Sequence, residues 1–394
     1  MNSLVKKCVC VFLLSVPCLF GCNKGNNEPP KEDPNEFEWV IYPDDTKEKT
    51  EEEMFIFPIK DGAELSILSP EWMSYYYDCK NYMNISLYYA AGKERTAPKS
   101  PSLRWDFSEE CDSFTLLVST SKEMTEPVSY QVDKKTQQLD NLFAGTTYYY
   151  QLKANLEDKV VLSKRMSFKT IDFFRTISLD GVFNARDLGN KKTVDGKRVK
   201  QGLVYRTANF DGVTSLGQEQ AKEFGIKVDL DLREQGPTSS PLGEDVRYIN
   251  NGFGKYGSPL YYSSLNGVNV SSYQKPMRDN LKVFVDPSNY PLAFHCAVGR
   301  DRTGTLAITL LLLLGVEVEQ IKQDYVVSFF SKACNTENLK SYNNLMVDLL
   351  DYYDYYRAKD GTYAEDIYQG VEKYCLDIGL TQEDIVSIRS NLLA

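Results

Sequence analysis

The chain has 394 residues, 42% of them hydrophobic and 25% charged, which excludes a wholly disordered or a fibrous protein. Its 45 Lys and Arg residues against 55 Asp and Glu residues give a net charge of −10. That charge argues against duplex DNA or an anionic membrane surface as the main partner. The only histidine, His295, excludes a histidine-rich zinc site and a hydrolase with a separate histidine base, so acid–base chemistry falls to other residue types.

Residues 1–21 have the pattern of an export signal: two lysines, then an apolar run over Val9–Phe20 that is too short to span a bilayer comfortably. Cys22 follows a glycine, as in the cleavage and lipidation site of bacterial lipoproteins, which this segment resembles. We expect lipidation at Cys22, a polar tether over residues 22–36, and anchoring of the exported protein in the periplasm or at the cell surface. The alternative is an ordinary secretory signal.

Five cysteines remain beyond the signal and the tether: Cys79, Cys111, Cys296, Cys334 and Cys375. An odd number in an exported protein leaves at least one thiol unpaired. Two pairs are compatible with the sequence, Cys79 with Cys111 and Cys334 with Cys375, and five free thiols are the alternative.

Residues 37–170 have the features of an all-β domain. Two segments in this region are rich in β-branched and aromatic residues, with turn residues between them: Ser113–Val118 and Tyr148–Ala154. Leu142–Tyr150 resembles the turn and tyrosine corner of fibronectin type III domains, with Ala144 in place of the usual proline, and Trp105 matches their core tryptophan. The resemblance implies a β-sandwich. The sequence does not identify a partner for this domain.

From residue 173 to 394 strands and helices alternate, which predicts an α/β domain with a central sheet flanked by helices. The predicted strands are Gly202–Arg206, Ile226–Leu232 and Pro291–His295. Ser215 and Gln218 predict a capped helix that ends at Gly225. The apolar segment Thr305–Leu314 predicts a core helix. Four more helices are predicted over residues 317–330, 337–356, 363–377 and 382–393, with starts at Thr362 and Thr381.

A strand that ends at His295, a short loop, and a helix that begins near Thr303 together predict an anion-binding site. Backbone N–H groups can surround a phosphate from loop residues Ala297, Val298, Gly299, Arg300, Asp301 and Arg302. Arg302 adds a planar fork matched to two phosphate oxygens. A thiol at Cys296 has its pKa depressed in this field, so it is a nucleophile at neutral pH. This chemistry needs no metal ion and no cofactor.

The segment His-Cys-Ala-Val-Gly-Arg-Asp-Arg-Thr-Gly over 295–304 resembles the signature loop of Cys-dependent protein tyrosine phosphatases. Its form is similar to that of a bacterial branch of dual-specificity, phosphoinositide-capable phosphatases. Further matches to that branch follow in the expected order: Asn184–Gly189, Val204–Thr207, Asp231–Arg233 and Asp324–Tyr325. The resemblance covers about 173–394 and implies a tyrosine-phosphatase-like fold.

The resemblance implies specific roles for the loop residues. Cys296 is the nucleophile that forms a phosphocysteine, and Arg302 binds the phosphoryl oxygens. Thr303 hydrogen-bonds the sulfur and assists its departure. His295 orients the loop and lowers the pKa of the thiol, or is simply a satisfied core histidine. Arg300 stands where the branch usually has lysine, which leaves substrate preference open.

The general acid has no single assignment from the sequence. Asp301, inside the loop, and Asp231, at a strand end, are the two main candidates for proton transfer. Asp231 has an alternative role, bracing the loop through an ion pair with an arginine. Asp286 is a third candidate.

We therefore expect a metal-independent protein-tyrosine or dual-specificity phosphatase acting on phosphorylated protein, with phosphoinositide lipid as a further substrate. Two alternatives belong to other classes. One is a non-catalytic phosphate-reading or adhesion lipoprotein, and the other is a sulfurtransferase with a rhodanese-type loop. We expect no nucleic-acid partner, and contact with the membrane only through the lipid anchor.

Overall fold

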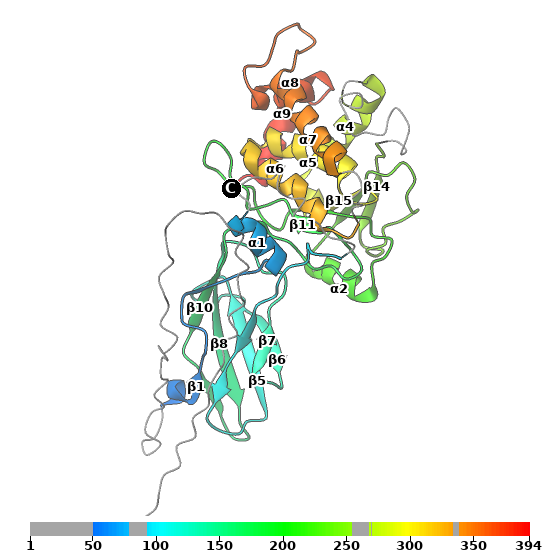
Figure 1. Cartoon of the computed structure of the whole chain (residues 1–394). Coiled ribbons are helices and arrows are strands. Elements are labelled where there is room, and N and C mark those ends of the chain that lie inside the picture. Colours follow the sequence, from blue (N-terminus) through cyan, green and yellow to red (C-terminus); the bar gives the residue numbers. More distant parts are fainter. Residues whose placement is uncertain (1–49, 79–92, 254–267, 269, 334–338) are drawn as a thin grey trace, which may run out of the picture. The chain divides into compact units, whose positions relative to one another are not determined.

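Two larger sheets, one in each half of the chain, organise the protein (Figure 1). The computed structural model describes residues 50–78, 93–253, 268, 270–333 and 339–394. The predicted signal peptide, Cys22 and the tether lie outside the described residues, as do Cys79 and Cys334. Free thiols are present at Cys111, Cys296 and Cys375.

The N-terminal sheet has the order β2-β10-β8-β5-β6, with β9 also paired to β8. Its central strands β5 (Ser113–Ser119) and β8 (Thr147–Asn155) lie where the sequence predicts them. Every second residue of β8 is buried, because successive side chains in a strand point to opposite faces. The other strands of this sheet are β2 (Ala63–Leu65), β6 (Val128–Val132), β9 (Val160–Leu162) and β10 (Met166–Thr170).

Two short strand pairs and a helix complete the N-terminal half. The pairs are β1 (Phe55–Ile56) with β4 (Asp106–Phe107) and β3 (Ser102–Arg104) with β7 (Thr136–Gln138). Besides a 3-10 turn, η1 (Glu51–Met54), this half contains helix α1 (Pro70–Asp78), which the all-β expectation missed. Pro70 fits the first turn of a helix, and Trp72 is fully buried.

The contacts of the predicted tyrosine corner are present. The Tyr148 hydroxyl accepts a hydrogen bond from the Phe143 backbone N–H at 2.7 Å. Trp105 is buried edge-on against Phe114, with ring centroids 5.5 Å apart. The fibronectin-type sandwich and the boundary between residues 170 and 173 stay predictions. Residues 49–394 form one compact unit, and both halves contribute to the same hydrophobic core.

The C-terminal sheet has the order β11-β12-β15-β13-β14. Strands β12 (Val204–Thr207), β15 (Leu292–His295), β13 (Val228–Asp231) and β14 (Arg247–Asn250) are parallel, whereas β11 (Arg186–Asp187) is antiparallel to β12. The carboxyl ends of parallel strands meet at one edge, which is where ligand sites form in such sheets. The mixed sheet with its helices confirms the predicted α/β class.

Helix α5 (Asp301–Leu313) follows β15, and all of its residues are buried. It contacts α4 (Ser271–Val283), α6 (Val318–Val326), α7 (Leu339–Asp354) and α8 (Ile367–Asp377). The remaining elements are α2 (Ser215–Glu223), η3 (Pro287–Asn289), η4 (Val327–Phe330) and α9 (Gln382–Leu392). Within the described ranges, no helix combines the length and the apolar character that crossing a bilayer requires.

Three predicted helix starts are wrong. α2 is capped by Thr214, whose hydroxyl accepts the Gly217 N–H, because Thr214 is extended while Ser215 is already helical. α8 is capped by Asp366 rather than starting at Thr362. α5 begins at Asp301, two residues before the predicted start. The capping box of Thr381 in α9 is confirmed.

Candidate active site

The loop between β15 and α5 approaches its neighbours so closely that only glycine fits at its centre. Gly299 has φ +71°, a conformation that side chains rarely adopt, and a Cβ there would lie 2.2 Å from the Thr207 carbonyl oxygen. Cys296 opens the loop and is only 2% exposed. The predicted phosphate-binding segment 297–302 is therefore a tight turn held directly against β12.

Three successive carbonyl groups of the loop accept hydrogen bonds from side chains outside it. The oxygen of Ala297 accepts from Asn209 Nδ2 at 2.7 Å, that of Val298 from Asn184 Nδ2 at 3.0 Å, and that of Gly299 from Arg206 Nη2 at 2.8 Å. In a planar peptide unit the N–H points opposite to the C=O. Fixing the carbonyls outward thus turns the N–H groups of residues 298–300 inward, as an anion site requires.

One of these side chains belongs to a buried charge cluster. Asp324 on α6 forms ion pairs with Arg206 at 2.6 Å, Arg186 at 3.1 Å and Lys191 at 3.3 Å. All four side chains are at most 2% exposed. Burial opposes ionisation of Asp324, but the three cations outweigh it and hold the pKa of this carboxyl well below its usual range. The cluster fixes Arg206, and Arg206 fixes the Gly299 carbonyl.

The Cys296 thiol lies in the field that the sequence predicts. Burial raises the pKa of this thiol, and so does the nearby Asp301 carboxylate. The charge of Arg302 and hydrogen bonding from Thr303 lower the pKa by more, so the net shift is downward. Apart from this sulfur, the buried Thr303 hydroxyl has no hydrogen-bond partner among the described residues. Arg302 also points to the Leu232 carbonyl, at 3.5 Å.

His295 is almost fully buried, with 1% of its surface exposed. Its Nε2 lies 2.9 Å from Asp229 Oδ1, and its Nδ1 lies 3.1 Å from the Cys296 carbonyl oxygen. The Cys296 carbonyl can only accept, so Nδ1 carries a proton, and Nε2 faces the Asp229 carboxyl group, an arrangement that favours the doubly protonated ring. Burial lowers the pKa of His295, but Asp229 and Asp231 outweigh this and raise it.

Asp231 is fully engaged by other side chains. It is buried, its two oxygens accept from the Arg233 guanidinium at 2.8–3.0 Å, and Oδ2 also accepts from the Tyr248 hydroxyl at 2.9 Å. Arg233 also contacts Asp211 at 2.7 Å. These contacts favour the bracing role for Asp231 over the role of general acid.

Asp301 and Arg300 face each other inside the loop. Arg300 Nε lies 3.0 Å from Asp301 Oδ1, both side chains are buried, and the guanidinium lies over the Phe329 ring at 5.7 Å. Asp286 is different: it caps η3, where its carboxylate accepts the Ser288 N–H at 2.9 Å. That position precedes β15 and lies at the opposite strand end from the loop, so the structure does not bring Asp286 to the site.

Sequence reasoning missed several residues at this site: Asp229, Asn209, Ser328, which accepts from Asn184, Phe329, and Phe210, whose ring lies 4.7 Å from that of His295. The charge of Asp229 within a buried apolar strand was a usable signal, because a buried carboxylate needs a partner. Here the partner is His295, with the Ser240 hydroxyl donating to the other oxygen at 2.8 Å. The other four carry no motif and are found only in three dimensions.

No group of three or more His, Cys, Asp or Glu side chains suited to a metal ion occurs within the described ranges.

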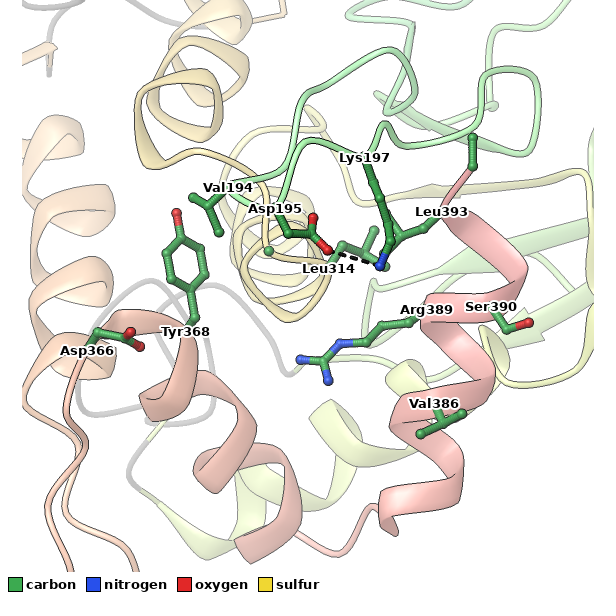
Figure 2. A pocket seen from close by; sticks show the side chains of 12 residues that line it. Val194, Asp195, Lys197, Leu314, Asp366, Tyr368, Val386, Arg389, Ser390 and Leu393 are labelled. Carbon is green, nitrogen blue, oxygen red and sulfur yellow. Dashed lines mark ion pairs between the residues drawn. The ribbon is translucent and has the colours of Figure 1, made fainter.

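A cavity of about 720 Å³ lies away from the loop, and Figure 2 shows its lining side chains, with Asp195 and Lys197 ion-paired. Leu314 and Gly315, which line it, follow the last turn of α5. The helix is about 20 Å long at 1.5 Å per residue, so this cavity and Cys296 lie at opposite ends of α5.

Similarity to solved structures is limited. The catalytic core of the PP-IP phosphatase SIW14 from S. cerevisiae, in complex with citrate, is 17% identical, with a TM-score of 0.27 over 38% of this chain and 84% of that one. P. aeruginosa TpbA is 13% identical, with a TM-score of 0.28 over 39% and 82%. At these values neither structure supports an argument about this chain.

Similarity to curated proteins and to a family model is more informative. A Cupriavidus necator protein named after the tyrosine-protein phosphatases is 28% identical over 177 residues, 39% of this chain and 62% of that protein. A tyrosine-protein phosphatase from Nostoc commune is 26% identical over 138 residues, 31% and 47%. The chain thus spans less than two thirds of either relative. The model of the tyrosine phosphatase family matches residues 177–394, more than half of the chain, which therefore belongs to that family.

Proposed function

We propose that this protein hydrolyses phosphomonoesters through a phosphocysteine on Cys296, with phosphotyrosine-like aryl phosphates as the preferred substrates. The observation that carries the proposal is the loop itself. A buried thiol with a lowered pKa lies at the base of a turn whose carbonyls are fastened outward. Such a site favours a dianion at the position where the sulfur can attack it.

In the first step the Cys296 thiolate attacks phosphorus, the S–P bond forms, and the P–O bond to the leaving group breaks. Arg302 and the inward N–H groups stabilise the charge on the equatorial oxygens. We assign to Asp301, in its protonated form, the proton that the leaving oxygen takes, because Asp231 is held by two partners, Arg233 and Tyr248, whereas Asp301 lies at the loop itself beside Arg300.

In the second step water attacks the phosphocysteine and the S–P bond breaks. The departing thiolate is stabilised by the charge of Arg302 and by hydrogen bonding from Thr303. Asp301, now ionised beside Arg300, accepts the proton of the water. The products are inorganic phosphate and the original thiolate.

Export, lipidation at Cys22 and the fibronectin-type sandwich are further parts of the proposal. They rest on the lipoprotein-like signal and on the tyrosine-corner contact between Tyr148 and Phe143. Labelling cells with a fatty-acid analogue tests lipidation: label is expected on the wild-type protein and lost in Cys22→Ser.

Residues 23–394 and the Cys296→Ser variant provide the test of the phosphatase activity. We expect p-nitrophenyl phosphate hydrolysis that survives EDTA in the presence of dithiothreitol, is inhibited by vanadate, and is absent in the variant. Activity that EDTA removes, or that persists in the variant, would contradict the thiolate mechanism. Tight phosphopeptide binding without turnover by folded, reduced wild type would favour the phosphate-reading alternative.

Substrate class is measured with the same protein. We expect kcat/KM for phosphotyrosine peptides to exceed that for phosphoserine peptides, because phenolate is the better leaving group. Phosphoinositide vesicles provide the lipid comparison. If kcat/KM is higher on these vesicles than on phosphotyrosine peptides, phosphoinositide and not phosphoprotein is the preferred substrate.

A further inference from the structure

Four consecutive residues, 328–331, lie between the active loop and the N-terminal half of the chain. On the loop side, Ser328 Oγ accepts from Asn184 Nδ2 at 3.2 Å, and the same amide donates to the Val298 carbonyl at 3.0 Å. Phe329 carries the guanidinium of Arg300 over its ring. Ser328 and Phe329 therefore support two separate points of the loop.

The other two residues contact the N-terminal half. The Phe330 ring lies 5.1 Å from the Trp72 ring, and the Phe330 carbonyl accepts the Arg95 backbone N–H at 2.8 Å. The Ser331 hydroxyl donates to Glu94 Oε2 at 2.7 Å, and the Lys332 backbone N–H donates to the same oxygen at 3.1 Å. Trp72, Phe330 and Ser331 are fully buried, so the ring contact is part of the core, whereas Glu94 is half-buried and holds Ser331 from the edge of the core.

The geometry of η4 and of Ser331, which follows it, explains how neighbouring residues contact both the loop and the N-terminal half. In a 3-10 helix successive side chains lie about 120° apart around the axis, so two neighbours can reach different points of the loop while the third faces away from it. Ser328 and Phe329 point to the loop, while Phe330 points to Trp72. A displacement of η4 would therefore move both the Val298 and the Arg300 supports together.

We propose that Trp72 and Glu94 are positioning residues for the phosphatase loop, so that the N-terminal half completes the active site instead of serving only as a spacer. The proposal rests on the phosphatase function proposed above. Catalysis by a preformed loop is sensitive to small shifts, since a misplacement of about 1 Å can cost on the order of 100-fold in rate. The contacts of Glu94 and Trp72 restrict such shifts of η4, and through η4 those of the loop.

The test compares four variants of residues 23–394, three of them measured by kcat and the fourth, Trp72→Phe, also by alkylation. We expect Glu94→Ala to lower kcat about fivefold to tenfold with little change in KM, the scale of one lost hydrogen bond at a half-buried side chain. Glu94→Gln keeps an oxygen that can accept the Ser331 hydroxyl, so it is expected to restore most of kcat. Glu123→Ala is the matched control: Glu123 also accepts a serine hydroxyl, from Ser121 at 3.1 Å, but that contact stays within the N-terminal half.

The pH dependence of Cys296 alkylation by iodoacetamide gives a second readout that a merely structural role would not move. A loosened loop stabilises the thiolate less, so the alkylation pKa is expected to rise in Glu94→Ala and in Trp72→Phe, and to stay unchanged in Glu123→Ala. Wild-type kcat and an unchanged alkylation pKa in both variants would overturn the proposal. An inactive wild type would refute the phosphatase function alone, because alkylation still reports on the loop.

Discussion

Charged side chains are buried at one end of α5 and exposed at the other. At its N-terminal end Asp324 and its three cationic partners are almost fully buried, and they fix the backbone around Cys296. At the other end lies the 720 Å³ cavity of Figure 2, where Asp195 and Lys197 form an ion pair with both side chains 54% exposed. Exposed pairs of this kind are screened by water and add little to stability.

This difference shows that the cavity does not mark the site of the chemistry. In the part of the chain that the structure describes, a helix dipole, inward N–H groups and a lowered thiol pKa coincide at the loop and nowhere else. Their alignment depends on side chains that are inaccessible from the surface. We therefore expect substitutions at the loop end to change stability and catalysis strongly, and matched substitutions at the cavity end to change neither.

The largest effect is expected for Asp324→Asn. Removing this carboxylate leaves three buried cations without their counter-charge, which typically costs about 3–5 kcal/mol of unfolding free energy. Urea denaturation followed by circular dichroism measures it. Because the folded-state pKa of Asp324 is depressed, its contribution is present above the ordinary carboxyl pKa and is lost as pH falls. The variant should therefore lose part of the acid sensitivity of the wild type, and equal midpoints would contradict the cluster's role.

The next effect concerns the fork of Arg302. Arg302→Lys keeps the charge but loses the paired donors, so kcat is expected to fall by about 100-fold, the scale of one transition-state contact. The affinity for vanadate should weaken in parallel, because the oxygens of vanadate occupy the same positions as the phosphoryl oxygens. A variant with wild-type vanadate affinity would show that Arg302 does not bind the phosphoryl group.

A smaller effect is expected from removing the imidazolium. His295→Asn withdraws a positive charge beside Cys296, so the pKa of the thiol should rise by up to about one unit. Activity then falls at mildly acidic pH and recovers as pH rises, measured as the acid limb of kcat/KM. The folded-state pKa of His295 is raised, so its own stabilisation is present at low pH and is lost as pH rises through that value. If the acid limb of kcat/KM does not shift in this variant, His295 is a core histidine with no influence on the thiol.

The smallest effect is expected at the cavity end. Lys197→Ala should leave kcat, KM and the melting temperature unchanged, because the pair with Asp195 is exposed. A loss of activity here would break the comparison, since it would couple the cavity to the loop across the length of α5.

The sequence by itself determined the order of strand, loop and helix around Cys296, the anion-binding character of 297–302, and the alternation that forms the C-terminal sheet. These features depend on neighbours in the chain and on backbone geometry, which local patterns report. The sequence also left two roles open for Asp231, proton transfer and bracing of the loop. The choice between them depends on Tyr248, which lies 17 positions away and donates to it across the sheet.

Only the tertiary structure decided which side chains fasten the loop. Asn209 and Ala297 are 88 positions apart, Asn184 and Val298 are 114 apart, and Glu94 and Ser331 are 237 apart. Hydrogen bonds over such separations leave no local pattern, because any of many amides or carboxylates could supply them until the core has packed. The sequence therefore specifies the reactive loop, and the folded core determines how firmly that loop is held.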